Sequence, residues 1–442
     1  MRSVTVKLLL LCAFFVTSVV CVAQTTKEPE SPLAKEADAV YPKIEPLYID
    51  IHEHPELSGH EVQTAAKMAA RLRALGYDVT EHVGGTGVVA LMRNGAGPTV
   101  MLRTELDALP VHEKTGLPYA STVRTKDDSG ADVWVAHACG HDAHMASLIG
   151  TATIMAQTKS EWHGTLMLIA QPAEETITGA EAMIKDGLFT RFPKPDIGLA
   201  LHTGNTLPAG MVGYIPGFAY AAADSLRVTI YGKGGHGAHP EATVDPIVIA
   251  ARTITTLQTI IAREITPGDP SVITVGYIHG GTKNNIIPDS VEMGITVRSY
   301  SEPTREHLLS SIARIVKAEA EAGNSPKPPT IEHYETTPAV YNDPKLSERL
   351  VPVLEKALGA QNVKQVPPQM VSEDYAYYVE AGVPSFYFAL GAADPVKFAE
   401  AQKDHTQLPS NHSPLYAPDV EPTLKTGVEA EVALLRSVLG GR

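Results

Sequence analysis

Cysteine is scarce in this chain, with three residues in 442. Two of them, Cys12 and Cys21, lie in the first 23 residues, and the third is Cys139. A chain that loses its first 23 residues keeps a single thiol, which excludes an internal disulfide. In an oxidising compartment such a thiol is either buried or held by a metal.

Long hydrophobic runs are also missing, except at the start. Arg2 and Lys7 precede an apolar run from Leu8 to Ala23. Charged, apolar and small residues in this order predict a secretory signal peptide over residues 1–23 and an exported protein, periplasmic or secreted. An uncleaved anchor is less favoured because the run is short for a membrane span. A lipid attached to Cys21 is a second way in which the segment could be processed.

Positive charge is in the minority, because 36 Lys and Arg stand against 50 Asp and Glu, for a net charge of −14. Cleavage after Ala23 removes two basic and no acidic residues, so the mature chain has 34 against 50 and a net charge of −16. Such a surface repels polyanions. It excludes nucleic acid and, beyond the signal peptide, anionic membranes from the expected partners.

A chain of 442 residues exceeds one ordinary core, so two domains are expected. Up to about residue 222, apolar strand-like runs alternate with helical patterns. The predicted strands are 77–82, 87–93, 99–104, 164–171 and 197–202, and the predicted helices are 45–52, 61–75, 143–158 and 180–185. This alternation predicts an α/β domain with a mostly parallel core, of the phosphorylase/hydrolase-like kind.

The pattern changes after residue 222. Strand, helix, strand, strand, helix and strand follow one another at 225–231, 246–261, 272–278, 291–300, 306–322 and 329–336. This order predicts a ferredoxin-like α+β unit. The first rhythm then resumes, with a helix at 346–358 and a strand at 385–390. We therefore expect a discontinuous first domain, 24–222 and 339–442, with a separate domain, 223–338, inserted in it.

The densest cluster of reactive side chains is Ala136-His137-Ala138-Cys139-Gly140-His141-Asp142. It places two imidazoles, a thiol and a carboxylate on one short segment, and a glycine lets the backbone turn. The Cys-x-His spacing lets Cys139 and His141 reach one metal or two neighbouring metals. A buried cysteine beside surface histidines is the plainer alternative.

Further ligand-type residues follow apolar strands. Glu174 and Glu175 come after one predicted strand, His202 ends another, and Asp107 follows a third. The carboxyl ends of parallel strands are where α/β sheets bind their ligands. One of two adjacent carboxylates can bind a metal while the other takes a proton from water. His412 lies in a late loop and adds one more imidazole.

Taken together, these motifs resemble those of the metal-dependent amidohydrolases and carboxypeptidases that include hippurate hydrolase, the indoleacetyl-amino acid hydrolases and N-acyl-diaminopimelate deacetylase, relatives of aminoacylase. The resemblance covers nearly all of the mature chain. Its motifs are Asp-Ala-Leu-Pro, His-Ala-Cys-Gly-His-Asp, Gln-Pro-Ala-Glu-Glu, Gly-Gly-His, Asn-Ile-Ile-Pro, Ser-Glu-Asp-Tyr and His-Ser-Pro. It implies hydrolysis of the amide bond in N-acyl amino acids or small peptides with a free carboxylate.

The resemblance also implies a metal site in the discontinuous domain. Two divalent ions, Zn or Mn with Co or Ni as further possibilities, would be held by Cys139, His141, Glu175, His202 and His412. Cys139 would be the ligand shared by both ions. Glu174 would be the general base, and Asp107 a carboxylate that orients a ligand imidazole.

The inserted domain would serve as a lid or dimerisation domain in a homodimer or higher homo-oligomer. By resemblance, His236 reaches the substrate carbonyl, often from a partner subunit, and stabilises the oxyanion. Asn285 and Arg298 would hold the substrate, and Arg298 suits a free carboxylate because its guanidinium forms two parallel hydrogen bonds. A turn histidine at 236 and a solvated strand position at 298 are the plainer alternatives.

The sequence departs from the family pattern at Thr104-Glu105 and at Thr203. Neither change removes a ligand, so they bear on the shape of the pocket more than on the mechanism. Two other classes stay open: a non-catalytic metal-binding or peptide-binding protein on the same fold, and a redox protein that uses Cys139.

Overall fold

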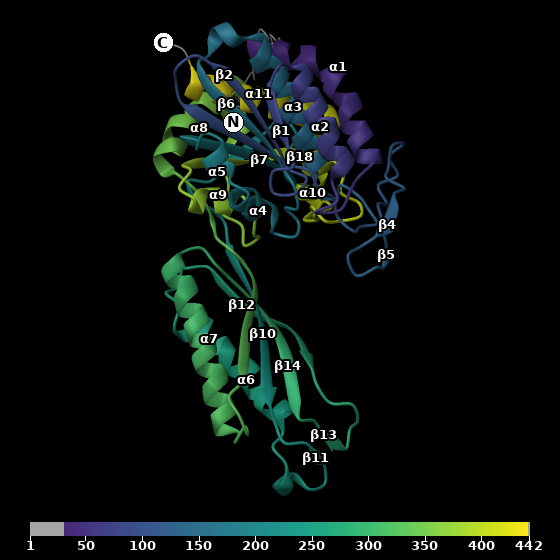
Figure 1. The fold of residues 1–442 in the computed structure, drawn as a ribbon, viewed down its shortest axis with the longest axis vertical. Coiled ribbons are helices and arrows are strands. Elements are labelled where there is room, and N and C mark those ends of the chain that lie inside the picture. The colour runs from purple at the N-terminus through teal and green to yellow at the C-terminus, as the bar shows by residue number, and fades with distance from the viewer. Residues whose placement is uncertain (1–30, 441–442) are drawn as a thin grey trace, which may run out of the picture.

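The computed structural model describes residues 31–440, and the predicted signal peptide, including Cys21, lies outside that range. The chain forms a large domain from which a smaller, elongated domain extends (Figure 1). None of the helices in the described range is long and apolar enough to cross a membrane.

The large domain is built on an eight-stranded sheet with the order β1-β2-β6-β3-β7-β18-β8-β17. Its centre, formed by β6, β3, β7 and β18, is parallel, which confirms the predicted core. The strands are β1 (Asp78–Glu81), β2 (Val88–Asn94), β3 (Thr99–Glu105), β6 (Gly164–Gln171), β7 (Ile197–Pro208), β8 (Val212–Tyr214), β17 (Val363–Gln365) and β18 (Ser385–Ala393). Short pairs are formed by β4 (Arg124–Lys126) with β5 (Asp132–Trp134) and by β9 (Gly217–Tyr220) with β16 (Val340–Asn342).

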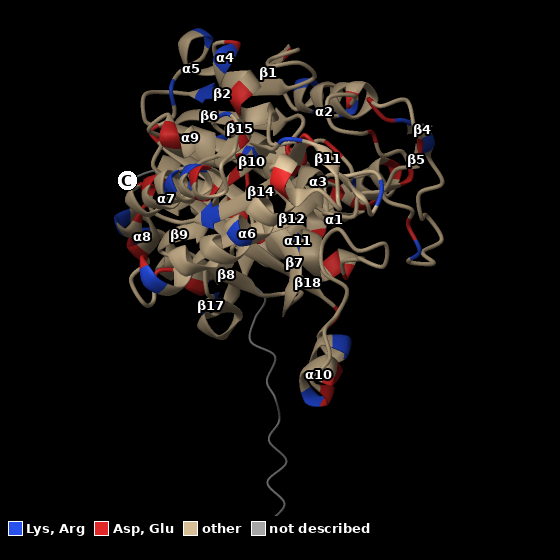
Figure 2. Ribbon diagram, turned by 90° about the horizontal axis from the view of Figure 1, so that it is seen from below, with Lys and Arg blue, Asp and Glu red and all other residues tan. Residues whose placement is uncertain are grey.

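Helices cover both faces of this sheet. One face carries α1 (Pro32–Glu53), α2 (Val62–Ala74), α3 (His141–Gln157), α8 (Pro344–Leu358) and α11 (Val420–Leu439). The other carries α4 (Gly179–Lys185), α5 (Leu188–Arg191) and α9 (Ala376–Glu380). Successive residues of a strand point to alternate faces, so Leu166 and Leu168 pack in the first core and Met167 and Ile169 in the second. α10 (Pro395–Asp404) projects from the body and carries charges of both signs (Figure 2).

The first helix is longer than the sequence predicts. The proline spacing predicts a helix only over 45–52, yet α1 begins at Pro32 and passes through Pro42 and Pro46. A proline inside a helix removes a hydrogen bond and costs about 3 kcal/mol. The prediction is wrong because the apolar stripe of α1 is buried against α3 and α11, and this burial outweighs the interruptions.

The smaller domain is a four-stranded antiparallel sheet in the order β12-β14-β10-β15, with two helices on one face. Its elements are β10 (Ala222–Tyr231), α6 (Pro246–Arg263), β12 (Ser271–His279), β14 (Ser290–Ser299), α7 (Glu302–Ala322) and β15 (Thr330–Thr337). This order confirms the predicted ferredoxin-like unit.

The chain enters and leaves the smaller domain through one neck. Ala223 on β10 lies opposite Thr337 on β15, so the two connections run side by side. At the other end of the domain, β11 (Gly235–His236) pairs with β13 (Ile286–Ile287), far from the large sheet (Figure 1).

Candidate metal centre

A cleft of about 600 Å³ opens between the large domain and the neck of the smaller one. Cys139, Glu174, His202 and His412 line it from the large domain, and Arg298 lines it from the smaller one. Its volume falls in the range usual for small-molecule sites. The structure thus brings together the segment after β6, the loop before α3, a late loop and the middle of β7. The prediction that His202 ends its strand is wrong, because β7 continues to Pro208 alongside β18.

The loop before α3 places Cys139 and His141. Gly140 turns the backbone with a φ of +88°, and a Cβ there would stand 2.4 Å from Thr203 Oγ1. Glycine is therefore required both for the turn and for the close approach of β7. The result is a fully buried thiol beside a fully buried imidazole at the start of α3.

His141 is fixed through its Nδ1. This nitrogen donates to the backbone carbonyl oxygen of Asp107 at 2.8 Å and lies 3.4 Å from the Asp107 carboxylate. Asp107 thus orients the imidazole mainly through its main chain, whereas the sequence predicts its carboxylate in that role. The His141 Nε2 is buried without a hydrogen-bond partner among residues 31–440, and it is able to bind a metal.

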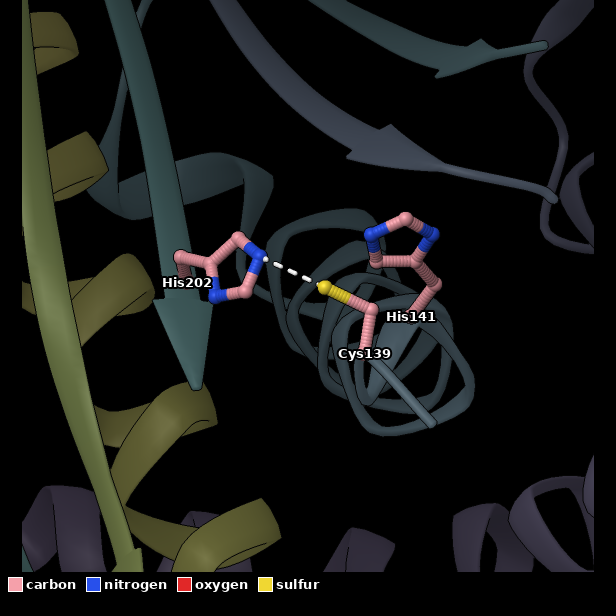
Figure 3. Close-up of side chains that lie close together, drawn as sticks. All are labelled: Cys139, His141 and His202. Carbon is pink, nitrogen blue, oxygen red and sulfur yellow. Dashed lines mark hydrogen bonds between the residues drawn. The ribbon is translucent and has the colours of Figure 1, made fainter. Parts of the chain in front are cut away.

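The Nε2 atom of His202 points toward the thiol of Cys139. Its Nδ1 donates to the carbonyl oxygen of Thr203 at 2.8 Å, and its Nε2 lies 3.3 Å from Cys139 Sγ (Figure 3). Burial lowers the pKa of His202 to about 3. A neutral imidazole with a free lone pair is the form that binds a metal.

Two buried carboxylates hold the turn that carries Glu174 and Glu175. Glu61 accepts from the N–H of Ala173 at 2.9 Å, and Asp107 accepts from the N–H of Glu175 at 2.9 Å. Ala173 has a φ of +50°, an uncommon conformation for a residue with a side chain. The two carboxylates therefore fix a turn that the backbone alone does not favour.

Burial also sets the charge state of the two glutamates. It raises the pKa of Glu174 well above its usual value, and the nearby Glu373 and Glu175 add to the effect. Burial raises the pKa of Glu175 to about 7, although the charge of His141 opposes it. Such carboxyl groups hold protons more readily than exposed ones, which suits a general base. A bound metal ion would favour the ionised form of a carboxylate that binds it.

The candidate ligands form overlapping groups that share one atom. Cys139, His141 and His202 form one group, and Cys139, Glu175 and His412 form another, with ligand atoms within 4.8 Å of one another in each. His412 Nε2 lies 3.3 Å from Glu175 Oε2. Thiolate, imidazole and carboxylate suit Zn and related divalent ions. The donor set therefore fits divalent metal ions, and Cys139 belongs to both groups.

The other predicted site residues divide into two groups. Arg298 lies in the cleft, and its Nη1 is buried without a partner among residues 31–440. His236 lies in β11 at the far end of the smaller domain. Asn285 lies beside it, because its carbonyl oxygen accepts a hydrogen bond from the N–H of Gly237, the residue after His236, at 2.8 Å. Neither His236 nor Asn285 lines the cleft of its own chain.

Sequence reasoning gave no role to a buried ionic network beside the cleft. Arg103 is fully buried, and its Nη2 donates to Glu373 at 2.8 Å and to Asp374 at 3.1 Å. Its Nη1 donates to Glu105, whose other oxygen accepts from His144 at 2.9 Å. The Ser-Glu-Asp-Tyr motif was the signal in the sequence, because it contains Glu373 and Asp374.

A mostly parallel α/β core with these donors gathered at one side of its sheet is typical of metal-dependent hydrolases. The model of peptidase family M20/M25/M40 matches residues 101–412, and this chain belongs to that family. The predicted family and enzyme class are thus confirmed.

Relatives agree with this assignment. Thermostable carboxypeptidase 1 of Saccharolobus solfataricus is 35% identical over 396 residues, which cover 87% of this chain and 92% of that protein. IAA-amino acid hydrolase ILR1-like 2 of Arabidopsis thaliana is 30% identical over 426 residues, 94% of this chain and 90% of that protein. The solved structure of the Bacillus subtilis YXEP protein, a dinuclear metal binding peptidase, is 28% identical with a TM-score of 0.72 and covers 90% of this chain and 98% of its own.

Proposed function

We propose that this family member is an exported amidohydrolase that uses two divalent ions to cleave N-acyl amino acids or dipeptides with a free carboxylate. The observation that carries the substrate class is the position of Arg298. Its buried, unpartnered Nη1 lines the same cleft as Glu174 and the candidate ligands. A substrate carboxylate would satisfy this guanidinium with two parallel hydrogen bonds.

Glu174 is the proposed general base. Its carboxylate lies in the cleft with one oxygen 3.8 Å from His141 Nε2, next to the candidate ligands. It would take a proton from the attacking water and pass it to the leaving amine. Two divalent ions bound at this site would polarise the scissile carbonyl and make water a stronger acid.

The metals are proposed to be Zn or Mn, with Co or Ni as substitutes. Cys139, His141, Glu175, His202 and His412 would hold them, and Cys139 would bridge them. A thiolate and imidazoles favour Zn, Co and Ni, whereas carboxylates also suit Mn. Among residues 31–440, His141 Nε2 and Glu175 Oε1 are buried without a hydrogen-bond partner, and these two atoms support this ligand set best.

His236 and Asn285 are proposed to act from a partner subunit in a homodimer. Both lie at the exposed end of the smaller domain, which extends away from the large domain of the same chain (Figure 1). In this arrangement the imidazole of His236 would stabilise the oxyanion of the transition state. Export by the signal peptide is proposed from residues 1–23 alone.

The function is tested by metal analysis of the purified protein together with hydrolysis of N-acetyl, N-benzoyl and indoleacetyl amino acids and of dipeptides. Each substrate is paired with its carboxamide analogue, which lacks the free carboxylate. We expect two ions per chain and a clear preference for the free acids. Arg298→Ala should remove that preference by raising KM for the acids alone.

Glu174→Gln and Glu175→Ala separate the two roles of the glutamate pair. Glu174→Gln should keep both ions and lower kcat by about 10²- to 10⁴-fold. Glu175→Ala should lose metal. A Glu174→Gln protein as active as the parent would refute the base assignment, and rapid alkylation of Cys139 in the metal-loaded protein would favour the redox alternative.

A further inference from the structure

His412 is held less by packing than the other candidate ligands. Its side chain is 56% exposed, whereas that of His141 is 0% exposed. Its backbone has a φ of +68°, in the left-handed region that costs free energy for a residue with a side chain. Such a conformation persists only where neighbouring groups hold it in place.

The preceding residue, Asn411, supplies that hold. Its side-chain Nδ2 donates to the carbonyl oxygen of Cys139 at 2.8 Å and to that of Thr203 at 3.1 Å. One amide therefore ties the His412 loop both to the loop before α3 and to the part of β7 that carries His202. The N–H of His412 adds a third tie, to the carbonyl oxygen of Ala138 at 2.8 Å.

The backbone of Thr203, which Asn411 contacts, makes two further hydrogen bonds. Its carbonyl oxygen also accepts from His202 Nδ1, which sets the direction of the His202 Nε2. Its N–H donates to His144 Nε2 at 2.9 Å. Because a backbone N–H can only donate, the His144 Nδ1 carries the proton and donates to Glu105 at 2.9 Å.

We infer that Asn411 is a positioning residue that closes the metal site by joining the segments of Cys139, His202 and His412. This inference rests on the proposed function. Both contacts require a donor, because the groups that Asn411 meets are two carbonyl oxygens. An oxygen at the same place would repel both of them and release the loop.

Asn411→Asp is the sharpest test, because it replaces the amide nitrogen by an oxygen with almost no change in shape. Asn205→Asp is its matched control. Asn205 also ties this loop to β7, but its amide donates to the carbonyl oxygen of Pro409 at 2.8 Å and not to that of Cys139 or Thr203. Zn²⁺ affinity is measured on the metal-free proteins by competition with a chelating dye. Unfolding midpoints are measured with and without Zn²⁺.

We expect Asn411→Asp to weaken the more loosely held ion by about 10- to 100-fold. Asn411→Ala, which removes the donor without adding repulsion, should weaken it less. The midpoint of the metal-free protein should fall less than that of the Zn²⁺-loaded protein, because the increase caused by Zn²⁺ shrinks as well. Asn205→Asp should bind both ions like the parent.

Two results would overturn the inference: Asn411→Asp binding both ions as tightly as the parent, or its metal-free midpoint falling as far as its metal-loaded one. The second would mean that Asn411 stabilises the fold and not the site. A parent protein that binds fewer than two ions would overturn the proposed function as well, so the two failures are distinguishable.

Discussion

Two arginines, Arg103 in the large domain and Arg227 in the smaller one, hold their charges in opposite ways. In the large domain, Arg103 is completely buried and bonded to Glu105 and Glu373. In the smaller domain, Arg227 is 43% exposed and lies 3.4 Å from Glu332 on the outer face of the sheet. A buried charge has only the partners that the fold provides, whereas an exposed one is also solvated by water. The Arg103 network therefore fixes the geometry beside the cleft, whereas the Arg227 pair leaves the surface around it free to rearrange.

Arg103→Met should produce the largest loss of stability. It would leave Glu105, Glu373 and Asp374 buried without their cation, and breaking such a pair costs about 3–5 kcal/mol. Urea unfolding of the metal-free protein, followed by the fluorescence of the buried Trp162, measures the change. An unfolding midpoint equal to that of the parent would contradict the contrast between the domains.

His236→Ala should lower kcat by about 10²- to 10³-fold, the usual effect of losing one oxyanion donor. Metal content should stay at the parent level, because His236 contacts no candidate ligand in its own chain. Mixing this variant with Glu174→Gln should restore activity, since one site of a mixed dimer would then have both groups intact. Absence of recovery in mixed dimers would contradict the action of His236 across subunits.

Glu431 gives the large domain a dependence on pH that its glutamine variant should lack. Burial raises the pKa of this carboxyl to about 8, although the hydroxyl of Thr151 donates to it at 2.6 Å. The folded state thus holds a proton that the unfolded state has released, so this stabilisation is complete below pH 4.5 and is lost as the pH rises to about 8.

Across that window the free energy of unfolding should fall by about 1.4 kcal/mol per pH unit on account of this one group. Glu431→Gln should remove that part of the slope and be more stable than the parent above pH 8. Unfolding curves of the metal-free proteins at several pH values measure it. Parallel curves for parent and variant would show that Glu431 is already ionised in the fold.

Arg227→Met should have the smallest effect. Its ion pairs are solvated and screened by salt, and such pairs contribute little. The unfolding midpoint should match that of the parent within experimental error. A loss comparable to that of Arg103→Met would remove the contrast from which these predictions start.

Part of the site could be expected from the sequence, because Cys139 and His141 share one short loop and Glu175 and His202 stand next to apolar runs typical of buried strands. The full set of proposed ligands, including His412, depended on the resemblance to a known family. The strands of the large sheet and the elements of the ferredoxin-like unit could also be predicted, because the spacing of apolar residues is regular within each element.

The partners that support the site could not be predicted. Arg103 and Glu373 are 270 residues apart in the chain, and Asn411 reaches Cys139 from a distance of 272 residues. No local pattern encodes such contacts. The prediction for the length of α1 was wrong for the same reason. Burial against α3 and α11 determines how far this helix extends, and outweighs the low helix propensity of its prolines.

Because both chain connections to the smaller domain run side by side at one neck, this domain can rotate about that neck relative to the large domain. Arg298 lies opposite Ala223, next to the place where both connections pass between the domains. His236 lies at the other end of the smaller domain. Any rotation about the neck carries His236 through a long arc and Arg298 through a short one. The guanidinium can therefore keep its place in the cleft while the distant imidazole swings.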